Sequence, residues 1–358
     1  MRSVPLLLLG LFSGCATLGP QTLPTVQAAY NDSLSLTQDT QFLLNIVRLR
    51  YRDTPAFLDV ASLTTQQTMS SSTSIGGSAQ LVPSPIVGGS ANFSGSMSVT
   101  PTTTFSPVRG DDFVKRLVAP MSLQTVTMVA SSGWSIARVL QLTVDRLNQV
   151  TNAPTATGPT PDLPPDTSRF ISLTRAMRVL QVSEQLSLSA LRDDGSSDSG
   201  VLNIDDASSQ TEPSRTVHEL LDLDPAVRRI RLTEDFTRRG PDILRVRLRS
   251  VLGAIFFLSQ GVDVPAEHEK AGLVTVTKDV SGARFEWQRV LDGIFRVRTS
   301  PSEPPRAAVK VKHRGHWFYI ADDDLDSKAT FMLLVQLFNM QAGRNAMPVP
   351  LLTIPAGQ

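Results

Sequence analysis

The sequence predicts an α+β fold, in which helices mix with short antiparallel strands and a long charge-free β-hairpin is inserted. Three observations support this class. Helical periodicity and strand alternation interleave along the chain without the regular order of a parallel strand–helix–strand fold. One long segment alternates between polar and apolar residues and carries no charge. The chain has 358 residues, of which 41% are hydrophobic, which is enough to build a core.

The overall charge gives no sign of a nucleic-acid partner. Lys and Arg number 34 against 33 Asp and Glu, for a formal net charge of +1. The single cysteine, Cys15, excludes an internal disulfide framework and every zinc site built from several cysteines.

Residues 1–14 predict a secretory signal peptide. Arg2 precedes the apolar run from Val4 to Phe12, and the small residues Ser13 and Gly14 follow it. The apolar run is far shorter than the about 20 residues that a membrane-spanning helix requires.

The stretch Phe12-Ser13-Gly14-Cys15 resembles the lipobox of bacterial lipoproteins, although that family usually has Leu where Phe12 stands. The resemblance covers the first 15 residues alone. It implies that Cys15 is acylated, for example with palmitate, and becomes the mature amino terminus. Because Ala16 follows instead of Asp, it also implies delivery to the cell outer membrane, with membrane lipid as a partner of Cys15. The alternative is a secreted protein with an unmodified cysteine.

Residues 15–35 are polar and contain proline, so we expect a lipid-anchored tether. Residues 36–150 are expected to form an N-terminal helical and β region that contains the hairpin. Periodicity predicts helices over residues 37–50, 111–117, 122–132 and 135–148, the last turning into a strand near Leu142, and a strand over residues 57–63.

The hairpin is predicted over residues 66–105. No residue from Val60 to Val108 is charged, and small polar residues alternate with apolar ones on both sides of a Pro-Ser-Pro turn centred on Ser84. That turn predicts three cross-strand pairs: Leu81 with Val87, Ile75 with Phe93, and Met69 with Val99. The apolar face would then contain Met69, Ile75, Ala79, Leu81, Ala91, Phe93, Met97 and Val99.

Three interpretations of this hairpin remain open. It inserts into a membrane, which requires several copies to close a ring of strands, because a lone hairpin would leave unpaired backbone groups in lipid. Alternatively, it belongs to a soluble sheet. The third interpretation is a mobile loop, since uncharged Ser/Thr/Gly-rich segments are often flexible.

The proline-rich residues 151–167 predict a linker or loop and the best domain boundary. Residues 168–358 are expected to form a C-terminal α+β domain. Its predicted helices are residues 168–185, 242–259 and 327–341, the last capped by Ser327 and ended by Gly343. Its predicted strands are residues 186–191, 201–204, 229–232, 273–277 and 295–298, together with a hairpin formed by 307–312 and 316–320.

No catalytic or cofactor motif is present. The four histidines include no pair at the i, i+4 spacing of a helical metal site, so we predict no metal ligand, no cofactor and no catalytic residue. His313 and His316 flank a turn and are expected to be solvated. The acidic run Asp322, Asp323, Asp324 and Asp326 favours a role at the amino end of the following helix over a calcium site.

An arginine-rich region extends from Arg228 to Arg249. Guanidinium groups suit phosphate or carboxylate, so Arg245, Arg247 and Arg249 are candidate contacts for an anion or an envelope partner. The competing interpretation is a solvated surface with internal ion pairs.

Together these features predict a lipid-anchored outer-membrane protein that is not an enzyme and forms a homo-oligomer or an envelope protein complex. Its hairpin would contribute to an envelope channel or secretion assembly. The alternative is a periplasm-facing scaffold or assembly module that binds another envelope protein. An envelope hydrolase is a third class, because catalytic groups can converge from distant positions.

Overall fold

The computed structural model describes residues 18–78, 88–107, 111–159, 163–190, 198–205 and 211–342. The chain forms two compact units. The first, which we call the body, contains the described residues before Phe57 and after Gly110. The second, the hairpin unit, contains the described residues between Phe57 and Arg109. The mixture of helices and largely antiparallel sheets confirms the predicted α+β class.

A six-stranded sheet organises one half of the body. Its order is β4-β3-β8-β7-β6-β5, in which β7 and β8 are parallel and the other neighbours are antiparallel. The strands are β3 (Val144–Leu147), β4 (Val150–Thr151), β5 (Leu186–Ala190), β6 (Asp198–Ile204), β7 (Arg229–Thr233) and β8 (Ile243–Leu248).

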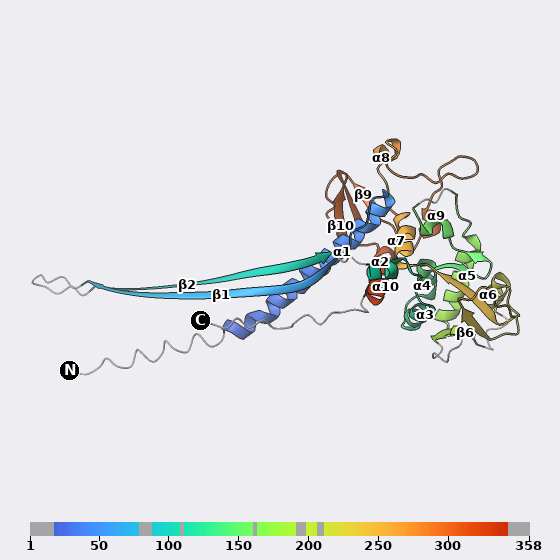
Figure 1. Ribbon diagram of the computed structural model, residues 1–358, viewed down its shortest axis with the longest axis horizontal. Helices are drawn as coiled ribbons and strands as arrows, with labels where there is room; N and C mark the ends of the chain where they lie inside the picture. Colours follow the sequence, from blue (N-terminus) through green and yellow to red (C-terminus); the bar gives the residue numbers. More distant parts are fainter. Residues whose placement is uncertain are drawn as a thin grey trace, which may run out of the picture. The chain divides into compact units, whose positions relative to one another are not determined.

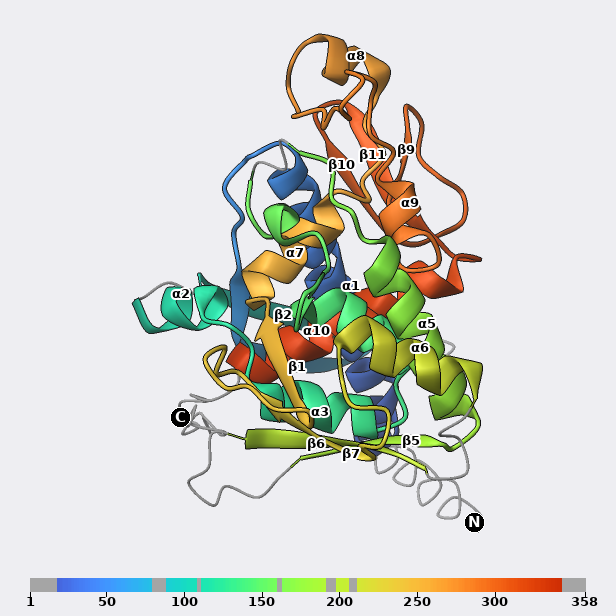
Figure 2. The ribbon, with the colours of Figure 1, turned by 90° about the vertical axis from the view of Figure 1, so that its right-hand side faces the viewer.

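Helices pack on this sheet through apolar side chains. Figure 2 shows α3 lying along β5 and β6. Buried Leu123, Leu140 and Met177, from three successive helices, line one apolar space with Leu202 and Leu244 of the sheet. The helices of this half are α2 (Asp111–Val118), α3 (Leu123–Ser131), α4 (Ile136–Thr143), α5 (Ser168–Val182) and α6 (Glu212–Leu221).

The other half of the body combines three core helices with a three-stranded antiparallel sheet of order β10-β11-β9. The fully buried side chains of Leu43, Leu258 and Leu334 lie on the three helices. The rings of Phe42 and Phe338 meet edge to face at 4.6 Å. These elements are α1 (Leu18–Arg50), α7 (Val251–Ser259), α10 (Leu325–Ala342), β9 (Arg298–Ser300), β10 (Ala307–His313) and β11 (His316–Ala321), with the short helices η1 (Pro154–Thr157), α8 (Ala266–Lys270) and α9 (Gln288–Leu291).

The predicted helix over residues 242–259 is wrong in its first half. The structure has β8, then a short helix α7 that begins after Ser250, whose side chain accepts a hydrogen bond from the Gly253 N–H. Val246 and Leu248 are buried, whereas Arg247 between them is exposed. This alternation with a period of two belongs to a strand.

The predicted boundary at residues 151–167 is also wrong, because this segment lies within the body. Ala153 and Ala156 are fully buried, and the Asn152 carbonyl accepts a hydrogen bond from Arg249. The segment is therefore a loop of the body that helps to fill its core. The structure divides the chain instead near Phe57 and Arg109, on either side of the hairpin.

Smaller differences concern the bounds of a few elements, one short strand and the cap of α10. Helix α1 begins at Leu18, so the described part of the expected tether, residues 18–35, is helical. Residues 273–277 are not a strand, and the strand expected at residues 295–298 is β9, which starts at Arg298. Asp324, not Ser327, caps α10: its carboxylate accepts hydrogen bonds from the Ser327 N–H and hydroxyl. Gly343 lies outside the described residues.

The hairpin unit consists of β1 (Leu58–Ser78) and β2 (Gly88–Pro107), which form a separate antiparallel sheet. Figure 1 shows the two strands running side by side along their length. Within the described part of the chain, no helix combines the length and the apolar character needed to span a membrane.

Candidate functional site

The hairpin is confirmed, but its register differs from the predicted one by two residues. Met69 pairs with Met97 and Ile75 pairs with Ala91, whereas Val99 and Phe93 were the expected partners. Because the side chains of a strand alternate, an even shift leaves every residue on its expected face. Ala79, Leu81 and the expected pair of Leu81 with Val87 lie outside the described residues.

A β-bulge in β1, near the end of the hairpin away from its turn, changes which residues of β1 share a face. The register shifts between Val60 and Ser62, so Ala61 is the extra residue of β1. Beyond the bulge, odd residues of β1 pair with odd residues of β2, while Val60 pairs with Phe105. The extra residue therefore keeps Val60 on the face that contains Met69. No feature of the sequence pattern that we used predicts this bulge.

The register divides the hairpin into two unlike faces. We call the face with the even residues from Ser62 to Ser78 and from Gly88 to Ser106 the polar face. Every residue there is Ser, Thr, Asn, Gln or Gly. The opposite, apolar face contains Ala91 and every Leu, Val, Ile, Met, Phe and Pro of both strands, interspersed with Thr, Ser, Gln and Gly. The hairpin is therefore an amphipathic ribbon with one face that is polar throughout.

The edges of the ribbon are the second notable feature. The sheet has two strands, so among the described residues each strand pairs on one side only. A row of backbone N–H and C=O groups along each outer edge is available to another strand. At about 3.3 Å per residue, strands of 21 and 20 residues extend for roughly 65 Å. This exceeds the hydrocarbon core of a bilayer, about 30 Å.

The three candidate arginines lie in three different environments on or beside β8. Arg249 is 1% exposed, and its guanidinium donates hydrogen bonds to the carbonyl oxygens of Gln141, Leu142 and Asn152. Burial lowers the pKa of Arg249 to about 9. Arg249 therefore belongs to the core, and the prediction that it contacts an external anion is wrong.

Arg245 and Arg247 remain closer to the surface. Arg245 is half-buried, and its Nε donates a hydrogen bond of 3.0 Å to Asn148 Oδ1. Arg247 is exposed, and its guanidinium lies 4.9 Å from the centre of the Phe236 ring. The structure does not bring the three arginines together into one anion site.

The acidic run lies at the amino end of α10, as predicted. Asp324 caps the helix, Asp322 forms an ion pair with Lys328 at 2.7 Å, and Asp326 forms one with Arg138. Cys15 lies outside the described residues.

The histidines show what sequence reasoning missed. His313 and His316 are half-buried, contrary to the expectation that they are solvated, and they converge with His268 and Tyr51. Tyr51 Oη lies 2.7 Å from His268 Nδ1, and the rings of His268 and His316 are 5.1 Å apart. His313 Nε2 lies 3.2 Å from Asp53 Oδ2. These residues come from segments far apart in the chain, so no local spacing reveals the cluster.

Comparison of the chain with protein-family models, curated proteins and solved structures finds no match.

Proposed function

We propose that this protein is a lipid-anchored outer-membrane protein, not an enzyme, whose hairpins join those of other copies in an envelope channel or secretion assembly. The observation that carries the proposal is the amphipathic ribbon with two unpaired edges. Each copy contributes β1 and β2 to a closed ring of strands. The acylated Cys15 holds the chain at the membrane surface.

A closed ring gives the unpaired edges of each hairpin a hydrogen-bonding partner. An isolated two-stranded hairpin is at best marginally stable in water. In lipid, each unpaired backbone group costs several kcal/mol. When the outer edge of β1 in one copy pairs with the outer edge of β2 in the next, both costs disappear. A closed ring of identical copies then leaves no free edge.

The two faces of the hairpin match the two environments of such a ring, water inside and lipid outside. The polar face contains Ser, Thr, Asn, Gln and Gly and suits a water-filled interior, while the apolar face suits lipid. The absence of charge from Val60 to Val108 agrees with this arrangement, because a charged side chain at the lipid-facing midplane costs about 2–4 kcal/mol.

The test compares charged substitutions on the two faces. The variants are Ile75→Asp with Phe93→Asp on the apolar face and, as a matched control, Ser74→Asp with Ser94→Asp on neighbouring positions of the polar face. Each is made in a chain with a non-lipoprotein secretory signal and Cys15→Ser, so that membrane binding depends on the hairpin. We expect the apolar-face pair to abolish sedimentation with membranes and the polar-face pair to retain it.

Electron microscopy of the detergent-extracted, acylated chain gives the second readout. We expect rings for the unaltered chain and for the polar-face pair, and smaller particles for the apolar-face pair. A monomeric unaltered chain, together with membrane binding that is insensitive to both pairs, would contradict the proposal.

A periplasm-facing scaffold is the second candidate, and the unpaired strand edges favour it as well, because a partner protein can add a strand to an open edge. In that case, the extracted chain forms a stable complex with one different protein. The complex is lost when residues 68–100 are deleted, and no ring is seen.

A further inference from the structure

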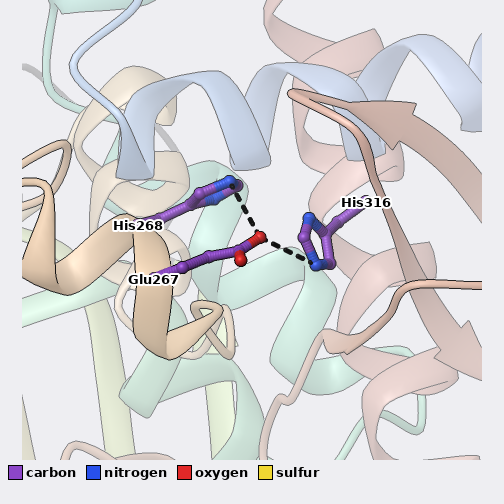
Figure 3. A group of neighbouring side chains, drawn as sticks. All are labelled: Glu267, His268 and His316. Atoms are coloured by element: carbon purple, nitrogen blue, oxygen red, sulfur yellow. Dashed lines mark ion pairs between the residues drawn. The ribbon is translucent and has the colours of Figure 1, made fainter.

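Two histidines and a glutamate meet at the edge of the body. Glu267 and His268 lie on α8, and His316 is the first residue of β11. Figure 3 shows the three side chains directed toward one another. Glu267 Oε1 lies 3.4 Å from His316 Nε2 and 4.0 Å from His268 Nε2. One ligand atom from each residue lies within 4.8 Å of the other two.

We propose that Glu267, His268 and His316 bind a divalent transition metal ion of the zinc class. Two imidazole nitrogens and one carboxylate form an established zinc ligand set. With bonds of 2.0–2.1 Å, tetrahedral geometry places ligand atoms about 3.3 Å apart. The Glu267–His316 separation already has this value, and a small rotation of Glu267, whose side chain is 69% exposed, brings its carboxylate closer to His268.

The three ligand atoms are not joined by hydrogen bonds. Their separations of 3.4 and 4.0 Å exceed the range of about 2.7–3.2 Å that N–H···O bonds adopt. A cation at their centre would be bonded to all three atoms. This convergence favours a metal ion over a simple ion pair.

Tyr51 positions the most buried of the three ligands. His268 is 8% exposed, and its Nδ1 lies 2.7 Å from Tyr51 Oη. When Nδ1 carries the proton and its N–H donates a hydrogen bond to the phenol oxygen, the lone pair of Nε2 is directed at the metal position. Metal-binding histidines commonly make such a second hydrogen bond, and it fixes both the tautomer and the orientation of the ring. Tyr51 therefore acts as a positioning residue.

The site is open on one side. Three protein ligands leave the fourth position of a tetrahedral ion for water or for a group from another molecule. The exposure of Glu267 gives an ion access from solvent. All three ligands belong to the body, so this proposal does not depend on the role of the hairpin.

The test measures binding of Zn²⁺ to the detergent-solubilised full chain without a histidine tag, by competition with a chromophoric chelator. We expect about one Zn²⁺ per chain. We expect Glu267→Gln and His316→Gln each to weaken binding at least about 100-fold. Glu286→Gln changes an exposed glutamate outside the ligand set, so it is the control and should leave the affinity unchanged. Both ligand variants change partly exposed side chains, and their thermal unfolding is recorded to confirm that they fold.

Two further measurements distinguish a coordinated ion from loose association. Co²⁺ in place of Zn²⁺ should give the visible absorption of a tetrahedral complex, and His316→Gln should abolish it. Tyr51→Phe retains the ring but removes the oxygen, so we expect affinity to fall by about 10- to 100-fold. Equal Zn²⁺ binding by the unaltered chain and by the Glu267→Gln, His316→Gln double variant would overturn the proposal.

Discussion

At the scale of single residues, Arg249 shows how the body keeps a positive charge in its interior. Three backbone carbonyls around the guanidinium take the place of water, and the Phe257 ring lies 4.0 Å from the guanidinium carbon. Gln141 and Leu142 belong to α4, while Asn152 follows β4. One side chain therefore ties the end of a helix to the loop that was predicted to be a linker.

Replacing Arg249 should destabilise the body strongly. In Arg249→Met the aliphatic volume is largely retained, but the Leu142 and Asn152 carbonyls lose their donor, while the Gln141 carbonyl keeps a hydrogen bond from the Asn152 side chain. We expect the free energy of unfolding to fall by about 2 kcal/mol or more, since each unsatisfied buried group costs about 1–3 kcal/mol. Arg247→Met, two residues away and exposed, should change it by less than about 1 kcal/mol. Denaturant unfolding measures both, and similar values would contradict the assigned role.

The sequence could not separate these arginines, because it contains the same residue type at alternating positions and burial depends on what packs across from each. The histidine cluster was missed for a related reason. Tyr51, His268 and His316 meet only after α1, α8 and β11 have packed. The motif rules that we applied detect ligands on one helix or loop. Contacts between distant segments leave no such signal in a single sequence.

At the scale of elements, alternation was the reliable signal. Between Met69 and Val99 it assigned the described residues of β1 and β2 to the same two faces that the observed register gives them. The hairpin β10–β11 was also predicted. In β8 the same signal was present in Val246, Arg247 and Leu248, but it was interpreted as part of a longer helix. Alternation determines which residues share a face but not which residues pair, so the register of β1 and β2 was predicted two residues away from the observed one.

The register can be tested with engineered disulfides, because Cys15 is the only native cysteine. Ser72 and Ser94 are paired in the structure, whereas the predicted register pairs Ser74 with Ser94. Directly opposite residues lie within disulfide range, while diagonal neighbours are about 7–8 Å apart. In a chain with Cys15→Ser, Ser72→Cys with Ser94→Cys should oxidise readily and Ser74→Cys with Ser94→Cys poorly. Thiol titration under mild oxidant reports the outcome, and the reverse order would support the predicted register.

At the scale of the whole molecule, composition marked the true division of the chain. The charge-free segment from Val60 to Val108 lies within the hairpin unit, while the proline-rich residues 151–167 are part of the body. Proline is compatible with a buried loop as well as with a linker, so it predicted a boundary where none exists. The hairpin unit is therefore an insertion between α1 and α2, and the body is built from sequence on both sides of it.

This division predicts that the body folds without the hairpin. Leu58 and Pro107 are directly paired across the two strands, so the ends of the insertion are close together. A linker of about four Gly and Ser residues can therefore replace residues 58–107. We expect the shortened chain to unfold within about 3 °C of the full chain, a shift that corresponds to less than about 1 kcal/mol, and to retain its Zn²⁺ affinity.

The same deletion separates folding from assembly. If the hairpin forms the shared ring, the shortened chain is monomeric in detergent while its thermal transition and metal binding are unchanged. A ring that persists without residues 58–107 would place the oligomer contact in the body and contradict the proposed function. A body that unfolds would instead show that the two units depend on each other for stability. Because the metal ligands and the ribbon lie in different units, loss of one property with retention of the other assigns each function to its own part of the chain.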